Sequence, residues 1–90
     1  MQFEWDEDKN ISNLFKHSVD FNQAIEVFSD ENKIESVDDR SDYGEQRIKV
    51  VGKSMDLMLS VIYTVRDTNY RIISARSASR KERADYNNNI

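Results

Sequence analysis

Basic residues able to bind phosphate gather in the second half of the chain. The candidates for contact with a phosphate are Arg47, Lys49, Arg71, Arg76, Arg80 and Arg83. A guanidinium group is a planar fork whose N–H groups match pairs of phosphate oxygens. The same side chains also form surface ion pairs with acidic residues, which are common and weak. For each arginine the sequence leaves both roles open.

The spacing of the arginines restricts which of them can act together. Residues 70–75 alternate as in a strand, so Arg71 and Arg76 point to opposite faces unless the strand ends or bulges between them. Arg76 follows this strand and is expected to turn toward the C-terminal helix that carries Arg80 and Arg83. Arg47 and Lys49 share one face of an earlier strand.

His17 is the one histidine of the chain, and histidine is the side chain that ordinarily titrates near neutral pH. It shares a helix face with Lys9 and Asn13, because these three residues are spaced by four. A general acid or base is one interpretation of His17. The other is a cation or hydrogen-bonding group that stabilises the end of a helix.

Three further side chains are secondary candidates. Glu45 would act as a general base if it were partly desolvated. Tyr63 lies in an apolar strand, where a tyrosine usually belongs to the core. Tyr86 follows Arg83 by three positions and would either stack on a base or pack the last helix against a sheet.

The net charge of -4 is unevenly distributed. Residues 1–46 carry 13 acidic and 4 basic residues, whereas residues 47–90 carry 4 acidic and 9 basic residues. A basic half indicates contact with a polyanion or an acidic partner. Attraction between the two halves of one fold explains the same pattern.

The chain is short enough to form one domain over residues 1–90. It has no cysteine, which excludes disulfides, thiolate metal sites and cysteine nucleophiles. No secretory signal is visible, and the apolar residues 57–65 fall far short of the roughly 20 that span a bilayer. We therefore expect a cytoplasmic protein without membrane contact.

Hydrophobic spacing predicts an α+β fold. A short N-terminal strand covers residues 3–5 and is followed by helices over residues 6–17 and from Asp20 to about Ser29. Strands are expected at 34–37, 47–51, 57–65 and 70–75, the last three as an antiparallel meander. A C-terminal helix begins at Ser79, which with Glu82 forms a capping box.

The helix over residues 6–17 is expected to bury an apolar stripe of Ile11, Leu14 and Phe15. In the second helix the expected buried residues are Phe21, Ala24, Ile25 and Phe28. Asp20 and Gln23 have the spacing of a capping box, and Val19 and Ala24 that of a hydrophobic staple.

Several short motifs occur together in an order that resembles one family. They are Phe3-Glu4-Trp5-Asp6, Lys16-His17, Val19 with Phe21 and Ala24, Tyr43-Gly44-Glu45 with Arg47, Tyr63-Thr64, residues 71–76, and Ala78 with Glu82-Arg83 and Tyr86. This set resembles the BrnT toxins, which are similar to RelE-like ribonucleases. Ser18 departs from the usual glycine after Lys16-His17. Because glycine suits a left-handed helix end, serine there requires strain or a different exit.

The resemblance implies an α+β, RelE-like fold and a toxin that cleaves RNA and blocks translation. It also implies a BrnA-like antitoxin with a ribbon-helix-helix domain, with two toxins bound to an antitoxin dimer. That antitoxin, rather than the toxin, would contact DNA.

RNA cleavage requires no metal or other cofactor, because the 2′-OH of the substrate is the nucleophile. It requires a base, an acid and cations that face the phosphate. With the resemblance, the catalytic candidates are Arg76, Arg80, His17 and Glu45, and the RNA-binding candidates are Arg47, Lys49, Arg71, Arg83 and Tyr86. Asp38, Asp39 and Asp42 have oxygen ligands for a hard cation, but a solvated polar loop is the simpler interpretation.

Two other functions compete with the ribonuclease. A non-catalytic module would only hold a ribbon-helix-helix partner, acting with it as a co-repressor. Direct DNA binding is disfavoured by the acidic composition and the absence of a recognition-helix motif.

Overall fold

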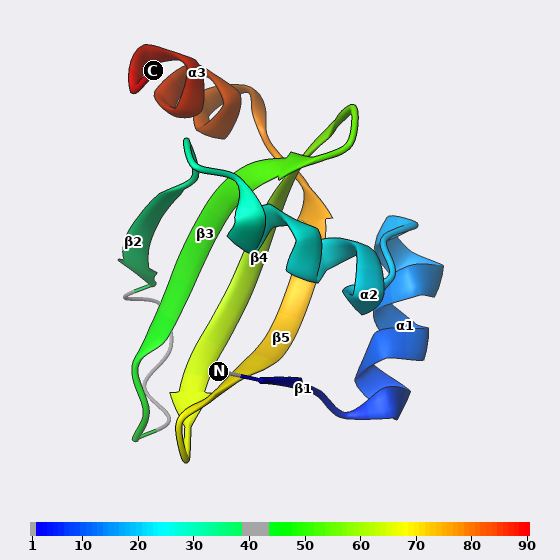
Figure 1. Cartoon of the computed structure of the whole chain (residues 1–90). Helices are drawn as coiled ribbons and strands as arrows, with labels where there is room; N and C mark the ends of the chain where they lie inside the picture. The colour runs from blue at the N-terminus through cyan, green and yellow to red at the C-terminus, as the bar shows by residue number, and fades with distance from the viewer. Residues whose placement is uncertain (1, 39–43) are drawn as a thin grey trace.

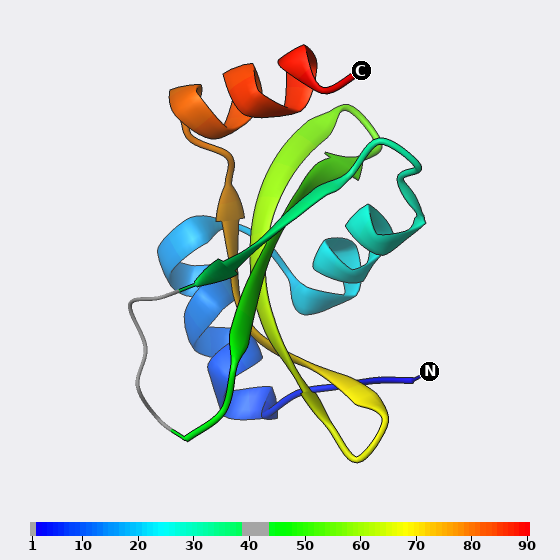
Figure 2. The same ribbon diagram turned by 90° about the vertical axis from the view of Figure 1, so that its left-hand side faces the viewer.

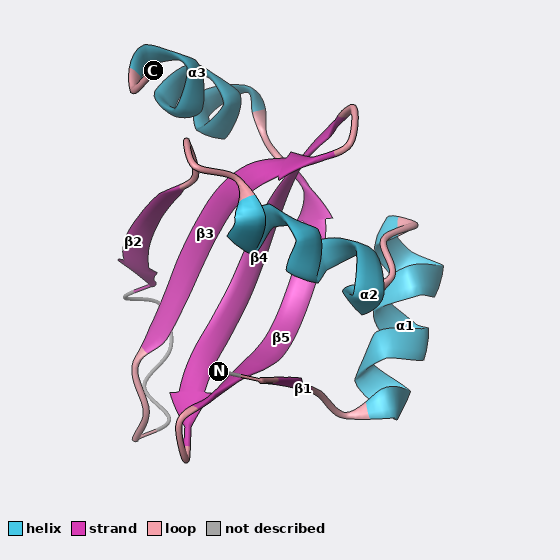
Figure 3. Ribbon diagram, in the orientation of Figure 1, coloured by secondary structure: helices cyan, strands magenta, loops and turns pink. Residues whose placement is uncertain are grey.

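The protein is an α+β fold in which one five-stranded sheet carries helices on both faces and along one edge (Figure 1). The computed structural model describes residues 2–38 and 44–90. The elements are β1 (Phe3–Glu4), α1 (Glu7–His17), α2 (Phe21–Ala24), the 3-10 helix η1 (Ile25–Ser29), β2 (Ile34–Asp38), β3 (Arg47–Ser54), β4 (Leu57–Arg66), β5 (Asn69–Ser77) and α3 (Arg80–Asn88). The predicted fold class and element order are confirmed (Figure 3).

The sheet has the strand order β1-β5-β4-β3-β2. Strands β2 to β5 are antiparallel neighbours, whereas β1 pairs parallel with the start of β5. Successive residues of a strand point to opposite faces. Val50 accordingly belongs to the core under α2 and η1, and its neighbour Val51 to a smaller cluster under α3.

The main core lies on the sheet face that α2 and η1 cover. Phe21, Ala24 and Val27 are fully buried against the central strands. Phe28 stacks on Tyr70 with ring centroids 5.3 Å apart, and it meets Tyr63 edge-on at 5.1 Å. Gly52 allows η1 to approach β3 closely, since a Cβ there would lie 3.1 Å from the Val27 carbonyl oxygen.

The opposite face of the sheet carries α3 at one end (Figure 2). Tyr86 is only 2 % exposed and packs with Val51 and Met58 in the cluster under α3. Its hydroxyl donates to Asp30 Oδ2 at 2.6 Å, which ties α3 to the turn before β2. We call the rest of this sheet face, where Arg47, Lys49, Arg71 and Arg76 lie, the open face.

A bulge in β5 decides which arginines share the open face. Ile62 pairs with Ser74 but Tyr63 pairs with Ile72, so Ile73 is an extra residue in β5. Ile72 and Ala75 therefore both point into the core. As a result Arg71 and Arg76 lie on the same face, which regular alternation would prevent.

Helix α1 buries its polar side and exposes its apolar side, which is the reverse of what the sequence predicts. Its buried residues are Asn10 and Asn13, while Ile11, Leu14 and Phe15 are 61 %, 48 % and 90 % exposed. The prediction that this apolar stripe is buried is therefore wrong. We call Ile11, Leu14 and Phe15 the exposed stripe.

The two asparagines are buried because they form hydrogen bonds with backbone groups at the edge of β5 and at the start of α2. β1 covers only the start of β5, which leaves the edge of β5 open at Ala75. Asn13 accepts from the Ala75 amide at 3.1 Å and donates to the Ala75 carbonyl at 2.8 Å, as a neighbouring strand would. Asn10 accepts from the Phe21 amide at the start of α2.

The segment after α1 also differs from expectation in two details. The predicted second helix is α-helical only over Phe21–Ala24 and continues as the 3-10 helix η1. Asp20 caps it by accepting from the Asn22 amide rather than through a capping box with Gln23. Ser18 ends α1 in the left-handed conformation at φ 59°, so serine takes the strained geometry that suits glycine.

We predict that polar Asn13 matters more for stability than apolar Phe15. Asn13→Ala should lower the free energy of unfolding by about 2–4 kcal/mol, because it leaves buried backbone groups of Ala75 and Val19 unpaired. Phe15→Gln should change it by less than about 0.5 kcal/mol, as for other exposed positions. Urea unfolding measures both, and the reverse order would contradict this packing of α1.

Candidate functional site

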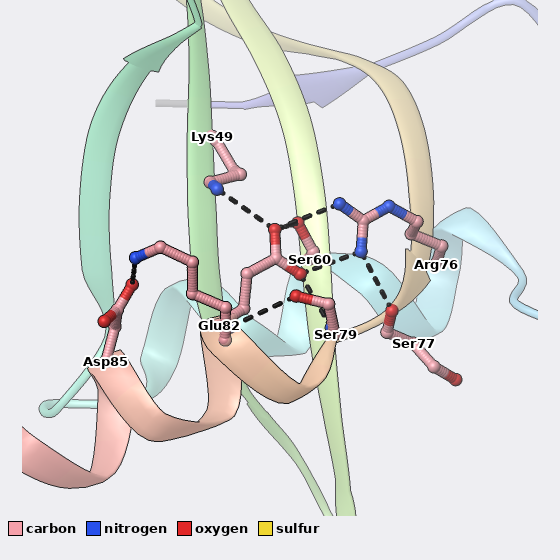
Figure 4. Close-up of polar contacts among 8 residues, drawn as sticks. Lys49, Ser60, Arg76, Ser77, Ser79, Glu82 and Asp85 are labelled. Carbon is pink, nitrogen blue, oxygen red and sulfur yellow. Dashed lines mark hydrogen bonds and ion pairs between the residues drawn. The ribbon is translucent and has the colours of Figure 1, made fainter.

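The carboxylate of Glu82 joins three elements on the open face (Figure 4). Arg76 of β5 binds it with both terminal nitrogens, Nη1 to Oε1 at 2.8 Å and Nη2 to Oε2 at 3.0 Å. Lys49 Nζ of β3 lies 3.0 Å from Oε2. Ser60 of β4 donates its hydroxyl to the same oxygen at 3.2 Å.

Glu82 reaches this position because of how α3 begins. The Ser79 hydroxyl accepts from the Glu82 amide, and Glu82 Oε1 accepts from the Ser79 amide at 2.8 Å. The predicted capping box is thus confirmed. The same carboxylate that caps the helix also binds the two cations, a second role that the sequence analysis missed. The sequence signal that could have pointed to this role of Glu82 is the Glu82-Arg83 motif, one of those that resemble the family.

We call Lys49, Ser60, Arg76 and Glu82 the Glu82 cluster. Its net charge is positive. One carboxylate faces two cations, Lys49 and Arg76, whose side chains are 32 % and 40 % exposed. Arg76 uses three of its five N–H groups on Glu82 and the Ser77 carbonyl. Its Nε–H and one Nη2 hydrogen have no hydrogen-bond partner within residues 2–38 and 44–90. These donors can therefore bind an added anion.

A hollow of about 240 Å³ lies beside the two cations and is lined by Ser36, Val37, Asp38, Lys49 and Arg76. Burial alone would raise the pKa of Glu82. Hydrogen bonds from Arg76, the Ser79 amide and Lys49 outweigh burial and hold that pKa well below the ordinary glutamate value. Glu82 is therefore a fixed anion that positions the cations, and a poor proton acceptor.

The remaining basic candidates are more dispersed. Arg71 is on the open face but pairs with Glu4 at 2.7 Å, where β5 meets β1. Arg47 lies in β3 opposite Asp38 of β2. Arg80 is exposed at the start of α3, and Arg83 donates to the Ala78 carbonyl at 3.2 Å. Of the predicted cations, Lys49 and Arg76 are the two that share one carboxylate in the described part of the chain.

Glu45 lies away from the Glu82 cluster, and Tyr86 lies inside the fold. Glu45 accepts from Arg66 at 3.2 Å near the start of β3, whereas Arg76 is opposite Ser60 toward the other end of β4. The buried ring of Tyr86 packs α3 against the sheet, which is the second of its two interpretations. Tyr63 is in the core, where burial and Glu35 raise its pKa to about 12.

His17 is exposed in the last turn of α1 and lies in a different hollow from Arg76. This second hollow has a volume of about 210 Å³ and also contains Lys9, Lys16 and Ser74. Lys9 and His17 thus share a face of α1, as their spacing predicts. Asp39 and Asp42 lie outside the described residues, and no metal-binding group of three or more His, Cys, Asp or Glu occurs within those described.

Comparison with known families matches residues 5–82 to the ribonuclease toxin BrnT of type II toxin–antitoxin systems. The chain belongs to the BrnT family. The matched segment includes Lys49, Ser60, Arg76 and Glu82, so the whole cluster lies in the part that defines the family. A comparison with curated proteins finds no match.

Membership in the BrnT family establishes a ribonuclease toxin class and implies an antitoxin partner. This assignment rests on the match over residues 5–82 and does not depend on which residues perform the reaction. None of the helices described in this BrnT-family chain is both long and apolar enough to cross a membrane.

We predict that Glu82→Gln lowers the free energy of unfolding more at neutral pH than at acidic pH. Because folding lowers the pKa of Glu82, its contribution is complete above the unfolded-state value of 4.5 and is lost as the pH falls through the lower folded-state pKa. Allowing for the partial exposure of Lys49 and Arg76, Glu82→Gln should cost about 2 kcal/mol at pH 7.

The measurement is urea unfolding of both proteins from pH 7 to pH 3. The difference between wild type and variant should shrink below about pH 4.5. Asp85→Asn is the matched control, because Asp85 pairs with Lys81 on the exposed side of the same helix. A constant difference across this pH range would show that Glu82 does not hold its cations as an ionised group.

Proposed function

We propose that the chain is a metal-independent endoribonuclease that binds RNA on the open face and blocks translation by cutting it. The observation that carries the proposal is the Glu82 cluster, where Lys49 and Arg76 are held beside a hollow with N–H donors still available. A phosphodiester there would meet the cations Lys49 and Arg76, with Glu82 bound to both and Asp38 on the wall of the hollow.

The chemistry follows from the substrate and these residues. The 2′-OH of RNA gives up its proton to a base and attacks the adjacent phosphorus, which forms a 2′,3′-cyclic phosphate, while the bond to the 5′-oxygen breaks and that oxygen takes up a proton. Negative charge accumulates on the phosphate oxygens, which the fork of Arg76 and the Lys49 ammonium would stabilise. Their positions are fixed before substrate binds, because Glu82 already holds both.

Proton transfer would need a group outside the Glu82 cluster, since the oxygens of Glu82 are already occupied by donors. We assign this role to His17, which is exposed beside the strand that carries Arg76. Arg71, Arg47, Arg80 and Arg83 would contact the RNA backbone farther from the scissile bond. Glu45 is the alternative proton acceptor.

We predict that Arg76→Lys lowers the single-turnover rate of RNA cleavage by about 100-fold or more, because lysine keeps the charge but loses the fork. His17→Gln should lower the rate by a similar factor. Arg66→Lys is the matched control, because Arg66 forms an ion pair with Glu45 at the far end of the sheet. An equal loss of rate in Arg66→Lys would instead favour Glu45 as the proton acceptor. Cleavage of labelled RNA in EDTA provides the measurement.

Two results would contradict the proposal. Wild-type activity that disappears in EDTA and returns with a divalent cation would overturn metal independence. Intact RNA together with tight binding of the antitoxin would favour the alternative, a non-catalytic module that acts as co-repressor through its partner.

We propose further that the antitoxin is a BrnA-like protein with a ribbon-helix-helix domain and that two toxins bind one antitoxin dimer. DNA would be contacted only through the antitoxin. The proposal rests on the family, whose description includes an antitoxin system.

The antitoxin should cover the exposed stripe of α1. Large contiguous apolar surfaces on a soluble protein commonly mark interaction sites. Glu7 and Asp8 lie one turn before Ile11 on the same side of α1, within the acidic half of the chain. The complementary partner is thus an apolar antitoxin segment with a basic residue at one end.

We predict that Phe15→Gln weakens antitoxin binding by about 30-fold, because Phe15 would be a central apolar anchor. Met55→Gln is the matched control, since Met55 is 86 % exposed on the β3–β4 turn. Calorimetric titration with a BrnA-like ribbon-helix-helix antitoxin measures the affinity. Equal affinities for both variants, or a Phe15-dependent dimer of the toxin alone, would overturn this placement.

A further inference from the structure

A second hollow lies between α1 and β5. Lys9, Ser12, Lys16 and His17 enter it from α1, and Ser74 enters it from β5. Its volume of about 210 Å³ accommodates a phosphate group. We call it the α1–β5 hollow.

The positive charges in the α1–β5 hollow are not neutralised. Within the described residues, no ion pair or hydrogen bond engages the side chain of Lys9, Lys16 or His17. On the open face, by contrast, Lys49, Arg71 and Arg76 all pair with a carboxylate. An anion entering the α1–β5 hollow therefore displaces no existing partner.

A helix dipole accounts for only part of this arrangement. Lys16 and His17 lie in the last turn of α1, where cations are favoured. Lys9 is near the other end of the helix, about 10 Å from Lys16 along the axis. It nevertheless lines the same hollow. The helix dipole does not explain why Lys9 lines this hollow, whereas a bound anion would explain it.

The α1–β5 hollow is anchored by Asn13 and adjoins the open face at Ser74. Asn13, which also lines it, fixes α1 to the edge of β5 through both of its hydrogen bonds with Ala75. Ser74 and Arg76 lie on the same side of β5, about 7 Å apart along the strand. A strand of RNA bound at Arg76 would therefore reach the hollow within one or two nucleotides by passing over Ser74.

We propose that the α1–β5 hollow is a second phosphate subsite, in which Lys9 and Lys16 bind an RNA backbone phosphate adjacent to the scissile one. The inference rests on the proposed ribonuclease function. It makes α1 part of the RNA-binding surface, on the side of the helix away from the exposed stripe. The ligand is a phosphodiester of the substrate, and the hollow selects for backbone charge rather than for a base.

The test is binding of a mixed-sequence 2′-O-methyl RNA oligonucleotide, which cannot be cleaved because it lacks the nucleophile. The double variant Lys9→Gln/Lys16→Gln should bind about tenfold more weakly, and the slope of log affinity against log salt should fall by about 0.7, the value for one lost phosphate contact on a single strand. Lys9→Arg/Lys16→Arg should bind like wild type. Lys33→Gln, at the turn before β2, controls for the loss of a surface charge elsewhere.

The outcomes separate this inference from the proposed function. If the oligonucleotide binds the wild type and loses affinity in Arg76→Lys but not in the Lys9/Lys16 double variant, the subsite is overturned and the ribonuclease proposal stands. If affinity and salt slope change equally in Lys33→Gln, the effect is general and the subsite is likewise overturned. If the wild type neither binds nor cleaves RNA, both proposals fail.

Discussion

One buried carboxylate organises the open face. Glu82 caps α3, accepts from Ser60 in the central strand and binds cations from the strands on either side. A buried glutamate without partners would lose its charge or destabilise the fold. Here the donors that compensate it are the side chains best suited to bind phosphate. The stability of α3 and the position of the cations therefore depend on the same interaction.

This coupling explains how a small domain can hold like charges close together. Lys49 and Arg76 would repel each other across the narrow strand β4 if no anion lay between them. Glu82 offsets that repulsion while leaving one net positive charge and unused N–H donors. A substrate phosphate would meet preorganised cations, so little reorganisation would be needed at the moment of reaction.

Helix α1 shows a second use of polar groups as structural elements. A five-stranded sheet this small has an edge at β5 that β1 only partly covers. The amide of Asn13 completes that edge, and Asn10 meets the first amide of α2. Because these asparagines occupy the buried side of α1, the apolar side is left to solvent, where it is available to a partner. The cationic side faces the α1–β5 hollow.

Much of the fold was predictable from local chemistry. The alternation of β3, the apolar run of β4, the acidic first turn and basic last turn of α1, and the Ser79–Glu82 capping box each depend on neighbours in the chain, and each is present. The motifs that resemble the BrnT family lie in order along the chain, and the family match over residues 5–82 confirms the resemblance. These features are encoded within short segments, which is why sequence suffices for them.

Only the tertiary structure decided which surfaces those elements present. Periodicity places Ile11, Leu14 and Phe15 on one side of a helix but cannot say that the edge of β5 needs asparagines more than the core needs that stripe. Nor could alternation locate the bulge at Ile73 that brings Arg71 and Arg76 to one face. The role of Glu82 between Lys49 and Arg76 likewise joins residues that are distant in the chain. The physical reason is common to all three: burial and charge compensation depend on what packs against an element, and that partner comes from elsewhere in the sequence.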